Sequence, residues 1–535
     1  MLVQNFADWL HVLIPSLVGY VQIYALPLAI AYFVHLCWHE SPAEKNANKL
    51  PVVNRILPFE PQLITRIRWG FWAKRILQQA HVEYGDDPYV LARGDMDVTV
   101  LPASMIPELN QLPAEVISTR EFHAHTLLGH ITGIDIVRKT GFHVKVLLNR
   151  LSPALPQQIE PMNRRISAAM TRALPQTPGE AAVIKPLELF VEFISEAVAL
   201  MLYGSPLCDD PEIVRLCHLH TRNSESSYFP SDQVFSGGYV ANHEAVFTIV
   251  FVMRFVPSWL QSTLVWLLPW KWSLARTWKA IQDVVVPEIE RRRKAEQRSD
   301  GDEEEHQDCI SWMVRDGKTD VEQDPEILAK LVGALTSGST FSTAGVVSGV
   351  IANLSIRPSL LEEVREEIQQ VYDETQGNWT NSALNSLPKL DSVMKETARL
   401  TPAAMVLYSR HVEDDFTLST GLKLHKGQRI TTVPQIKSMN PETYRDPHTF
   451  DGLRHCGGQA FRKVDNDVLT WGSGRWACPG RFVANVMAKM VLVKLILEYD
   501  FRLVGDKKLP DVVMHEFTLF NPFTKLEVQR RDQVS

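Results

Sequence analysis

The sequence has few cysteines, and none of them stands in a closely spaced pair. Structural zinc sites and dithiol redox sites both need such pairs, so the spacing argues against each kind of site. Cysteines this sparse in a chain of 535 residues indicate a reducing compartment. The six are Cys37, Cys208, Cys217, Cys309, Cys456 and Cys478.

The sequence also lacks an excess of positive charge. It has 55 basic and 62 acidic residues, a net charge of −7, and no basic stripe with interleaved aromatic residues. A nucleic-acid partner requires such a stripe, so we expect no nucleic acid among the partners. No internal repeat is visible either, which argues against a solenoid or a propeller.

Charged residues are absent from Trp9 to Trp38, and this apolar run exceeds the ~20 residues that cross a bilayer. Asp8 stands where a cleaved signal has basic residues, so we expect the span to be retained as an anchor. Lysine and arginine residues follow the span and favour a cytoplasmic body. We therefore predict a single-pass membrane helix within residues 1–40 and a proline-containing linker over 41–61.

Residues 62–535 have a mainly helical pattern with small β-sheets, and we treat them as one domain. The apolar stretch 247–272 is interrupted by Arg254, Lys271 and two prolines, so it predicts a core helix or a surface that dips into lipid and not a second span. Strand patterns appear only late in the chain. The clearest predicted helices cover 187–203, 325–354, 359–372 and 482–499, the predicted strands cover 416–419, 422–424 and 429–433, and the acidic tract 297–308 predicts a loop.

One stretch, Trp471-Gly-Ser-Gly-Arg-Trp-Ala-Cys478-Pro-Gly480, precedes the last predicted helix. Its glycines allow positive φ and a close approach to a flat ligand. A cysteine at the start of a helix has its thiolate stabilised by the helix N-terminus, which suits an axial iron ligand. A lone cysteine among glycines is also typical of a small buried turn residue, so the stretch alone leaves both interpretations open.

The stretch resembles the heme-binding signature of the cytochrome P450 family, with an aromatic residue, Gly474, Cys478 and Gly480 at the family's spacing. The resemblance implies that Cys478 is the axial ligand of heme b and that Gly472 and Gly480 lie against the heme. Two residues before the cysteine, the family usually has Arg or His near a heme propionate. Here that position is Trp476, with Arg475 adjacent, so propionate binding is altered.

A second motif of the same family is Glu-x-x-Arg, present here as Glu396 and Arg399 on one face of a predicted helix. The segment Asp446 to Arg454 resembles the family's following segment, although Gly452 stands where a proline is usual. The resemblance makes Arg454 the third member of a buried triad that fixes the cysteine loop and performs no chemistry.

The resemblance also assigns basic residues to the heme propionates. Arg410, eight residues after a proline, occupies the place of the usual propionate arginine, and a guanidinium fork suits a carboxylate. Arg150 and Lys145 are the candidates for the second propionate. Three nearby histidines do not share one helical face, so we interpret them as loop and core residues and not as a metal cluster; they are His123, His125 and His130.

The family's oxygen-activating helix corresponds to Gly338 to Thr343. Phe341 replaces the usual acidic residue and Ser342 the usual threonine, so proton delivery cannot use the standard pair. Ser342, Thr343 or Thr340 could hold a water in their place, because a hydroxyl both donates and accepts. The same hydroxyls could instead bond back to helix carbonyls, and both interpretations stay open.

The sequence is similar to fungal microsomal enzymes of secondary metabolism, which implies a heme-thiolate monooxygenase in the endoplasmic reticulum membrane. The expected substrate is a lipophilic terpenoid, indole-diterpene or polyketide intermediate. The alternatives are desaturation or rearrangement without oxygen insertion, and a non-catalytic membrane heme protein.

No nucleotide fingerprint or flavin module is present, so electrons should come from NADPH through a separate flavoprotein, the NADPH-cytochrome reductase, with cytochrome b5 as a further partner. Basic residues outnumber acidic ones between Arg454 and Lys494, which predicts a docking face for an acidic partner. Charge reversal of Lys463 and Lys489, which lie in that stretch, would test the predicted docking face.

Overall fold

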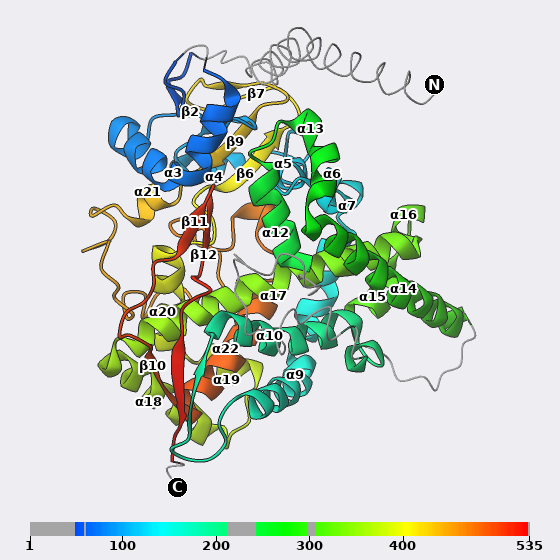
Figure 1. The fold of residues 1–535 in the computed structure, drawn as a ribbon, viewed down its shortest axis with the longest axis vertical. Coiled ribbons are helices and arrows are strands. Elements are labelled where there is room, and N and C mark those ends of the chain that lie inside the picture. The colour runs from blue at the N-terminus through cyan, green and yellow to red at the C-terminus, as the bar shows by residue number, and fades with distance from the viewer. Residues whose placement is uncertain (1–48, 58–59, 211–212, 214–241, 298–306, 533–535) are drawn as a thin grey trace, which may run out of the picture.

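The central element of the protein is a buried helix, α17 (Pro325–Ser355), which crosses the middle of the molecule (Figure 1). Asp324 caps its first turn by accepting from the N–H groups of Glu326 and Ile327, and Pro325 suits the first helical position. The structure is a computed structural model that describes residues 49–57, 60–210, 213, 242–297 and 307–532. The predicted membrane helix within 1–40 and the first part of the linker lie outside the described residues.

Helices make up most of the body, as the sequence predicts. Their bounds agree closely with the four strongest predictions, because each of those segments has a long apolar face. In chain order the helices are α3 (Gln62–Tyr84), α4 (Ile106–Leu109), α5 (Arg120–Thr126), α6 (Gly129–Thr132), α7 (Ile136–Lys139), α8 (Phe142–Val146), α9 (Ser152–Ala173), α10 (Pro186–Tyr203), α12 (Asn242–Met253), α13 (Ser258–Leu264), α14 (Pro269–Gln297), α15 (Cys309–Asp316), α16 (Asp320–Gln323), α17, α18 (Pro358–Glu374), α19 (Asn381–Asn385), α20 (Pro388–Leu400), α21 (Gln435–Ser438) and α22 (Arg481–Glu498).

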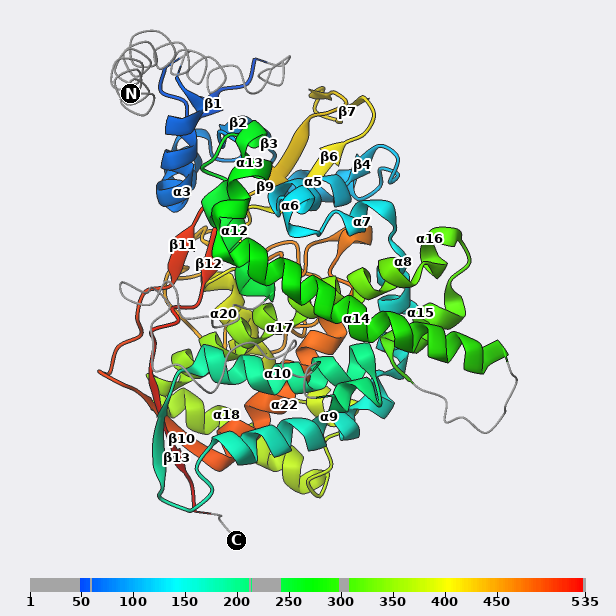
Figure 2. The same cartoon turned by 45° about the vertical axis from the view of Figure 1, so that its right-hand side comes forward.

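The sheets lie at different ends of the molecule, with the strands β2, β6 and β9 at the top and β10 at the lower left, near α18 (Figures 1 and 2). A six-stranded sheet has the order β1-β2-β3-β9-β6-β4, a three-stranded sheet the order β10-β13-β5, and two hairpins are β11–β12 and β7–β8. The strands are β1 (Val52–Val53), β2 (Tyr89–Ala92), β3 (Asp97–Val100), β4 (Ile117–Ser118), β5 (Ala181–Ile184), β6 (Leu407–Val412), β7 (Phe416–Thr417), β8 (Lys423–Leu424), β9 (Arg429–Thr432), β10 (Tyr499–Leu503), β11 (Val512–Met514), β12 (Phe517–Leu519) and β13 (Leu526–Arg530).

The prediction that strands occur only late in the chain is wrong. Five short strands precede residue 185, and β3 pairs in parallel with β9, more than 300 residues later. All four residues of β2 are buried, so this strand has no alternating pattern to reveal it. Short strands of this kind depend on partners distant in the sequence, which propensity does not register.

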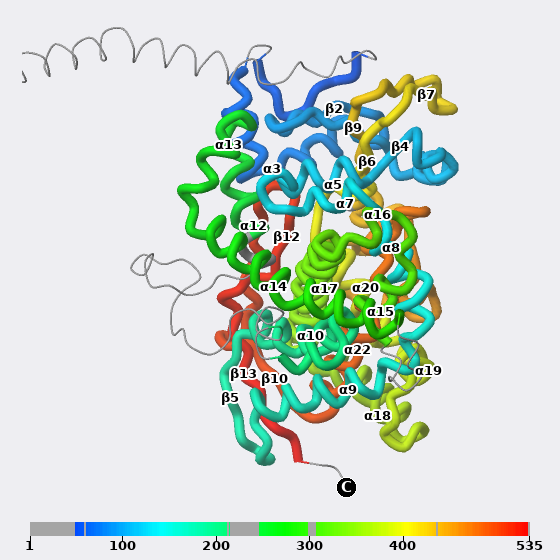
Figure 3. Tube along the Cα trace, turned by 90° about the vertical axis from the view of Figure 1, so that its right-hand side faces the viewer, coloured from blue at the N-terminus to red at the C-terminus, as the bar shows by residue number. Residues whose placement is uncertain are grey.

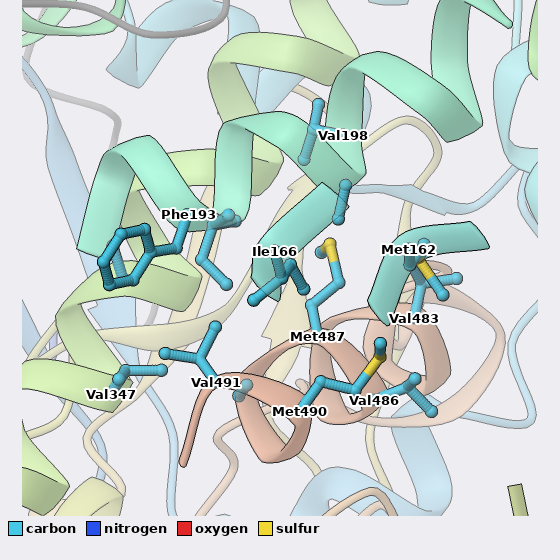
Figure 4. Packing of buried hydrophobic residues seen from close by; sticks show 14 of the residues in the cluster. Met162, Ile166, Phe193, Val198, Val347, Val483, Val486, Met487, Met490 and Val491 are labelled. Carbon is cyan, nitrogen blue, oxygen red and sulfur yellow. The ribbon is translucent and has the colours of Figure 1, made fainter. Parts of the chain in front are cut away.

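The main core lies where α9, α10, α17 and α22 meet (Figure 4). Phe193 of α10 is fully buried among Ile166 of α9, Val347 of α17 and Val491 of α22. Helix α22 is apolar nearly all round, as expected for a helix enclosed on every side. This packing encloses α22 among α9, α10 and α17, which lie close to it in the tube view (Figure 3).

Among the described helices, none is by itself long and apolar enough to cross a membrane, and α17 reaches the required composition only together with α18, at a bend of 119°. The stretch 247–272 forms the end of α12, α13 and the start of α14. Its exposed side chains include Trp266, Leu267 and Trp272, which gives this region an apolar surface.

We expect Phe193→Ala to lower the free energy of unfolding by about 3–5 kcal/mol, because it leaves a cavity between α10 and its neighbours. Urea denaturation of the solubilised full chain, followed by circular dichroism, measures the change. Val183→Ala, at an exposed position of β5, is the matched control and should stay within about 0.5 kcal/mol of the wild type. Equal losses in the two variants would contradict this description of the core.

Candidate active site

Cys478 lies in a tight loop immediately before α22. Gly472 and Gly474 have φ of +69° and +67°, values that favour glycine, and they turn the chain so that Cys478 approaches the N-terminus of α22. The Cys478 N–H donates to the Trp471 carbonyl over 2.7 Å, which closes the loop. Gly480 is the N-cap residue, and a Cβ added there would meet nothing within 4 Å. The loop therefore presents a sulfur beside open space.

Some groups around Cys478 raise the pKa of its thiol, and others lower it. Burial raises the pKa of the thiol, whereas the N–H groups of Gly480 and Arg481 and the charge of Arg481 lower it, with burial prevailing. Arg481 also donates to the Cys478 carbonyl over 2.9 Å. A thiol in this position loses its proton when it coordinates a metal cation, because the cation supplies the missing positive charge.

A polar network holds the cysteine loop from outside. Asn110 donates to the Ser473 hydroxyl over 3.0 Å and accepts from the Tyr408 hydroxyl over 2.7 Å. Ser473 in turn lies 2.7 Å from Asn466. A Cβ on Gly474 would lie 2.1 Å from Asn110 Oδ1, so Gly474 is needed for space as well as for its backbone angle.

Arg410 is buried next to this loop without a counter-charge. Its Nη2 lies 3.4 Å from the Ser473 carbonyl, its Nε has no hydrogen-bond partner, and no carboxylate in the described part of the chain lies within ion-pair distance. Burial lowers the pKa of the guanidinium to about 10. A buried, uncompensated cation is costly, so the site is suited to an anionic group bound beside the cysteine.

A β-bulge aims Arg410 inward. Pairing between β6 and β9 shifts register between Leu407 and Arg410, and Tyr408 has a φ of +54°, which is unusual for a residue with a bulky side chain. The Arg410 guanidinium then stacks 4.0 Å from the Tyr408 ring centroid. Backbone strain of this kind persists where the surrounding structure enforces it, commonly at functional sites.

Two histidines, His123 of α5 and His143 of α8, have a lowered pKa, and His123 is tied to the site through Arg410 and Thr119. Burial, and then the charge of Arg120, lowers the pKa of His143 to about 4, and its Nδ1 is buried without a partner. Burial, and then Arg410, lowers the pKa of His123 to about 4, although the His123 ring is accessible. A desolvated yet accessible ring is expected for a side chain that lines an internal cavity.

The two residues predicted for the second propionate bind acidic side chains elsewhere. Arg150 forms a fork with Asp316 of α15 over 2.7 Å, and Lys145 lies 3.6 Å from Glu322 of α16. Both are exposed in part, so the structure does not place them in the site.

An open strip runs along α17. A Cβ added to Gly338 or Gly345 would meet nothing within 4 Å, and Ser342, between them on the same face, is exposed although α17 is the central helix. Ser342 and Thr343 donate to the Gly338 and Ser339 carbonyls over 3.0 and 2.7 Å. These bonds favour the interpretation that the hydroxyls stabilise the helix, and their predicted catalytic role stays a prediction.

The predicted triad of Glu396, Arg399 and Arg454 is assembled around a fully buried carboxylate. Arg399 donates two hydrogen bonds of 2.7 Å to Glu396, and Arg454 Nε lies 3.1 Å from Glu396 Oε1. His455, which the sequence analysis missed although it adjoins Arg454, lies 3.1 Å from Glu396 Oε2. Arg399 also donates to the Ser438 and Pro447 carbonyls and so ties α20 to the segment before the cysteine loop.

The remaining predicted residues are less enclosed. Arg475 is exposed, and Trp476 is half-buried within the cysteine loop. The prediction that Lys489 lies on a docking face is wrong, because Lys489 is fully buried and lies 3.0 Å from Asp391. Lys463, in contrast, is exposed.

The site is thus a cysteine loop with a buried positive charge beside it, which defines a protein with an anionic, metal-containing prosthetic group. The family model described as Cytochrome P450 matches residues 69–528, and the chain therefore belongs to the cytochrome P450 family. It is a monooxygenase of that family, and the family implies heme.

Curated relatives cover nearly the full length. The chain is 27% identical to the cytochrome P450 monooxygenase olcJ of Penicillium canescens, over 96% of this chain and 94% of the relative. It is 27% identical to the cytochrome P450 monooxygenase AtmP of Aspergillus flavus, over 88% and 89%, and 27% identical to the cytochrome P450 monooxygenase janP of Penicillium janthinellum, over 92% and 94%.

The described residues fit heme on three independent grounds. The loop presents Cys478 beside open space at Gly480, the buried cation of Arg410 lacks a counter-charge that a propionate supplies, and α17 offers a strip with room for a flat ligand and a substrate. None of these features serves the packing of the protein by itself.

We expect the acid sensitivity of the fold to depend on Glu396. Burial raises the pKa of Glu396, but the bonds from Arg399, His455 and the Asp451 N–H prevail and lower it from 4.5 to about 2. Because the folded-state pKa lies below the unfolded value, the ionised carboxylate stabilises the fold fully above about pH 4.5, and this stabilisation is lost as the pH falls toward 2.

Glu396→Gln should therefore lower the free energy of unfolding at neutral pH by a few kcal/mol. On acidification, the free energy of unfolding of this variant should fall less steeply than that of the wild type. Urea denaturation at a series of pH values measures both. Glu290→Gln, at an exposed position of α14, is the control and should follow the wild-type curve. A wild-type slope in Glu396→Gln would show that this carboxylate does not titrate as described.

Proposed function

We propose that the protein is a heme-thiolate monooxygenase, anchored in the endoplasmic reticulum membrane with its body in the cytoplasm, that oxidises a lipophilic secondary-metabolite intermediate. A terpenoid, an indole-diterpene or a polyketide is the proposed substrate class. The observation that carries the proposal is the juxtaposition of the Cys478 loop with the buried, uncompensated Arg410. The apolar run before residue 40 supports the membrane anchor.

Each residue of the site has a definite task in this proposal. Cys478 would hold the iron, and the buried Arg410 would bind a propionate. When bound, heme activates dioxygen for insertion into a C–H bond of the substrate. The protein supplies binding, orientation and protons, and Ser342 can release its bond to the Gly338 carbonyl to hold a water on the open strip of α17.

The substrate side of α17 is apolar and aromatic. Phe341, next to Ser342, lies 6.4 Å from the ring of Phe247, and both rings are half-buried. Leu335 and Val346, which precede and follow the open strip along α17, are also half-buried. A surface of this kind binds a lipophilic substrate by excluding water.

The first test is isotopic labelling. Microsomes that contain the chain, a reductase and NADPH would receive terpenoid, indole-diterpene and polyketide precursors under labelled dioxygen, and we expect one labelled oxygen per oxidation in the product by mass spectrometry. Cys478→Ser should give no product, since a hydroxyl cannot supply the thiolate ligand. Label in products of Cys478→Ser would contradict the proposal.

A second candidate is desaturation or rearrangement without oxygen insertion. It is favoured by one observation: Phe341 has no proton to deliver, and the Ser342 hydroxyl is already bonded to a helix carbonyl. A product without label in the same experiment would support this candidate and would make Phe341 and Ser342 the residues to vary.

The proposal includes a separate reductase, with cytochrome b5 as a further electron donor, docking on the cysteine side. A groove of about 640 Å³ lies there, between the segment Gly458–Val464 and the start of α22, and it is lined by Lys463 and Arg481. An exposed lysine at the rim of a groove attracts an acidic partner at long range, and salt screens this attraction.

Lys463→Glu should therefore slow reduction of the heme by the reductase more strongly at low salt than at high salt. Stopped-flow reduction at two ionic strengths measures the effect. The matched control is Lys279→Glu, an exposed lysine on α14, which should reduce at the wild-type rate. The same slowing at both salt concentrations would argue against an electrostatic role for Lys463.

A further inference from the structure

Four charged side chains are buried together beneath the turn of the β11–β12 hairpin. Arg254, just after α12, lies 3.0 Å from Glu516 and 3.3 Å from Asp95. Arg93 lies 3.0 Å from Asp95 and 3.5 Å from Glu516. We call these four residues the charge cluster. Both arginines are only 1% exposed, so water compensates neither of them.

The charge cluster joins segments that are distant in the sequence. Arg93 and Asp95 come from the β2–β3 turn. Arg254 directly follows α12, and Glu516 lies in the β11–β12 turn. These segments lie near α3 (Figures 2 and 3). Trp69 of α3 donates its indole N–H to Glu516 over 3.2 Å. A mutual network of this kind resists displacement, because moving one member leaves another charge unpaired.

A row of aromatic rings lies on α12, on β12 and on α17, close in sequence to Arg254 and Glu516 of the charge cluster. Phe247 and Phe251 lie one turn apart on α12, and Phe517 of β12 packs against both, at 5.6 and 5.8 Å between ring centroids. Phe247 then reaches Phe341 of α17 at 6.4 Å. We call these four rings the aromatic row. It ends beside Ser342 and the open strip of α17.

The charge cluster and the aromatic row are adjacent along the chain at two points. Glu516 directly precedes Phe517, and Arg254 follows Phe251 by three residues. The turn has two further backbone ties, because the Glu516 carbonyl accepts from the Met405 N–H over 2.7 Å and the His515 N–H donates to the Gly70 carbonyl over 2.9 Å. The backbone ties and the charge cluster thus act together on the turn from which Phe517 projects.

We propose that Glu516 and Arg254 are positioning residues, which set where Phe517 and Phe247 stand against Phe341 and thereby shape the substrate side of the open strip. This inference rests on the proposed function, since it concerns the space above the heme. It deepens that function by assigning a specificity role to a carboxylate that touches no substrate. The aromatic rings so placed suit a substrate with a flat ring system, since aromatic faces and edges attract one another.

A purely structural role is the competing explanation. Buried ion pairs often add little net stability, whereas loss of one partner destabilises, so a stability change in a Glu516 variant would not distinguish the two roles. The test therefore needs a readout of ring position. Glu516→Asp keeps the charge that compensates the two arginines, which favours folding, but shortens the side chain by one methylene group.

The readout is the binding of two nitrogen ligands to the ferric heme of the solubilised full chain. Imidazole is a small ligand, whereas phenylimidazole carries a second ring that extends further from the iron. Absorbance titrations would give the ratio of the two dissociation constants, phenylimidazole over imidazole. We expect this ratio to rise about fivefold in Glu516→Asp, the size of a lost aromatic contact.

Two further variants make the result decisive. Phe517→Ala removes a ring of the row and should raise the ratio as well. Glu288→Asp shortens another buried carboxylate, which lies 2.6 Å from Arg292 on α14, and should leave the ratio unchanged. An unchanged ratio in Glu516→Asp, or an equal rise in Glu288→Asp, would overturn the inference.

Spectra of the ferrous carbonyl complex, recorded on the same preparations, test the proposed function separately. A thiolate-type spectrum in all variants, together with the expected ratios, supports both the function and the positioning role. A wild-type protein without the thiolate-type spectrum would overturn the proposed function and this inference with it. A thiolate-type spectrum with unchanged ratios would overturn the inference alone.

Discussion

The ionised carboxylate of Glu396 is the interaction on which the rest of the site depends. It is fully buried, and it is tolerated there because Arg399, Arg454, His455 and a backbone N–H surround it with donors. The donors come from α20 and from the irregular chain that leads to the cysteine loop. An irregular segment cannot satisfy its own backbone groups as a helix does, so it needs anchors of this kind to keep one shape.

The cysteine loop shows the opposite arrangement of charge. Around Glu396, cations and the anion compensate one another within the protein, whereas Arg410 is buried with no acid beside it among the residues that the structure describes. A protein that must hold an anionic cofactor leaves a positive charge uncompensated until the cofactor binds. Placing this charge strains the backbone at Tyr408, which has a positive φ, and desolvates the Arg410 guanidinium, whose pKa is lowered.

The two faces of α17 have different roles. One face packs into the core formed with α10 and α22 and holds the helix in place. The other carries Gly338, Ser342 and Gly345, where the absence of large side chains leaves room. Phe341 stands at the edge of that room and connects it to the aromatic row of α12 and β12. The helix can therefore be rigid and still border a space shaped by neighbouring elements.

The sequence by itself determined the long helices, the Cys478 loop and the pairing of Glu396 with Arg399. Apolar periodicity and close spacing are local properties, and a three-residue separation on a helix already places two side chains on one face. Only the tertiary structure decided the strands β1 to β5, the partners of Arg150 and Lys145, the burial of Lys489 and the roles of Asn110 and His455. These depend on contacts between residues far apart in the chain, such as Asn110 with Ser473, and a local pattern carries no record of such contacts.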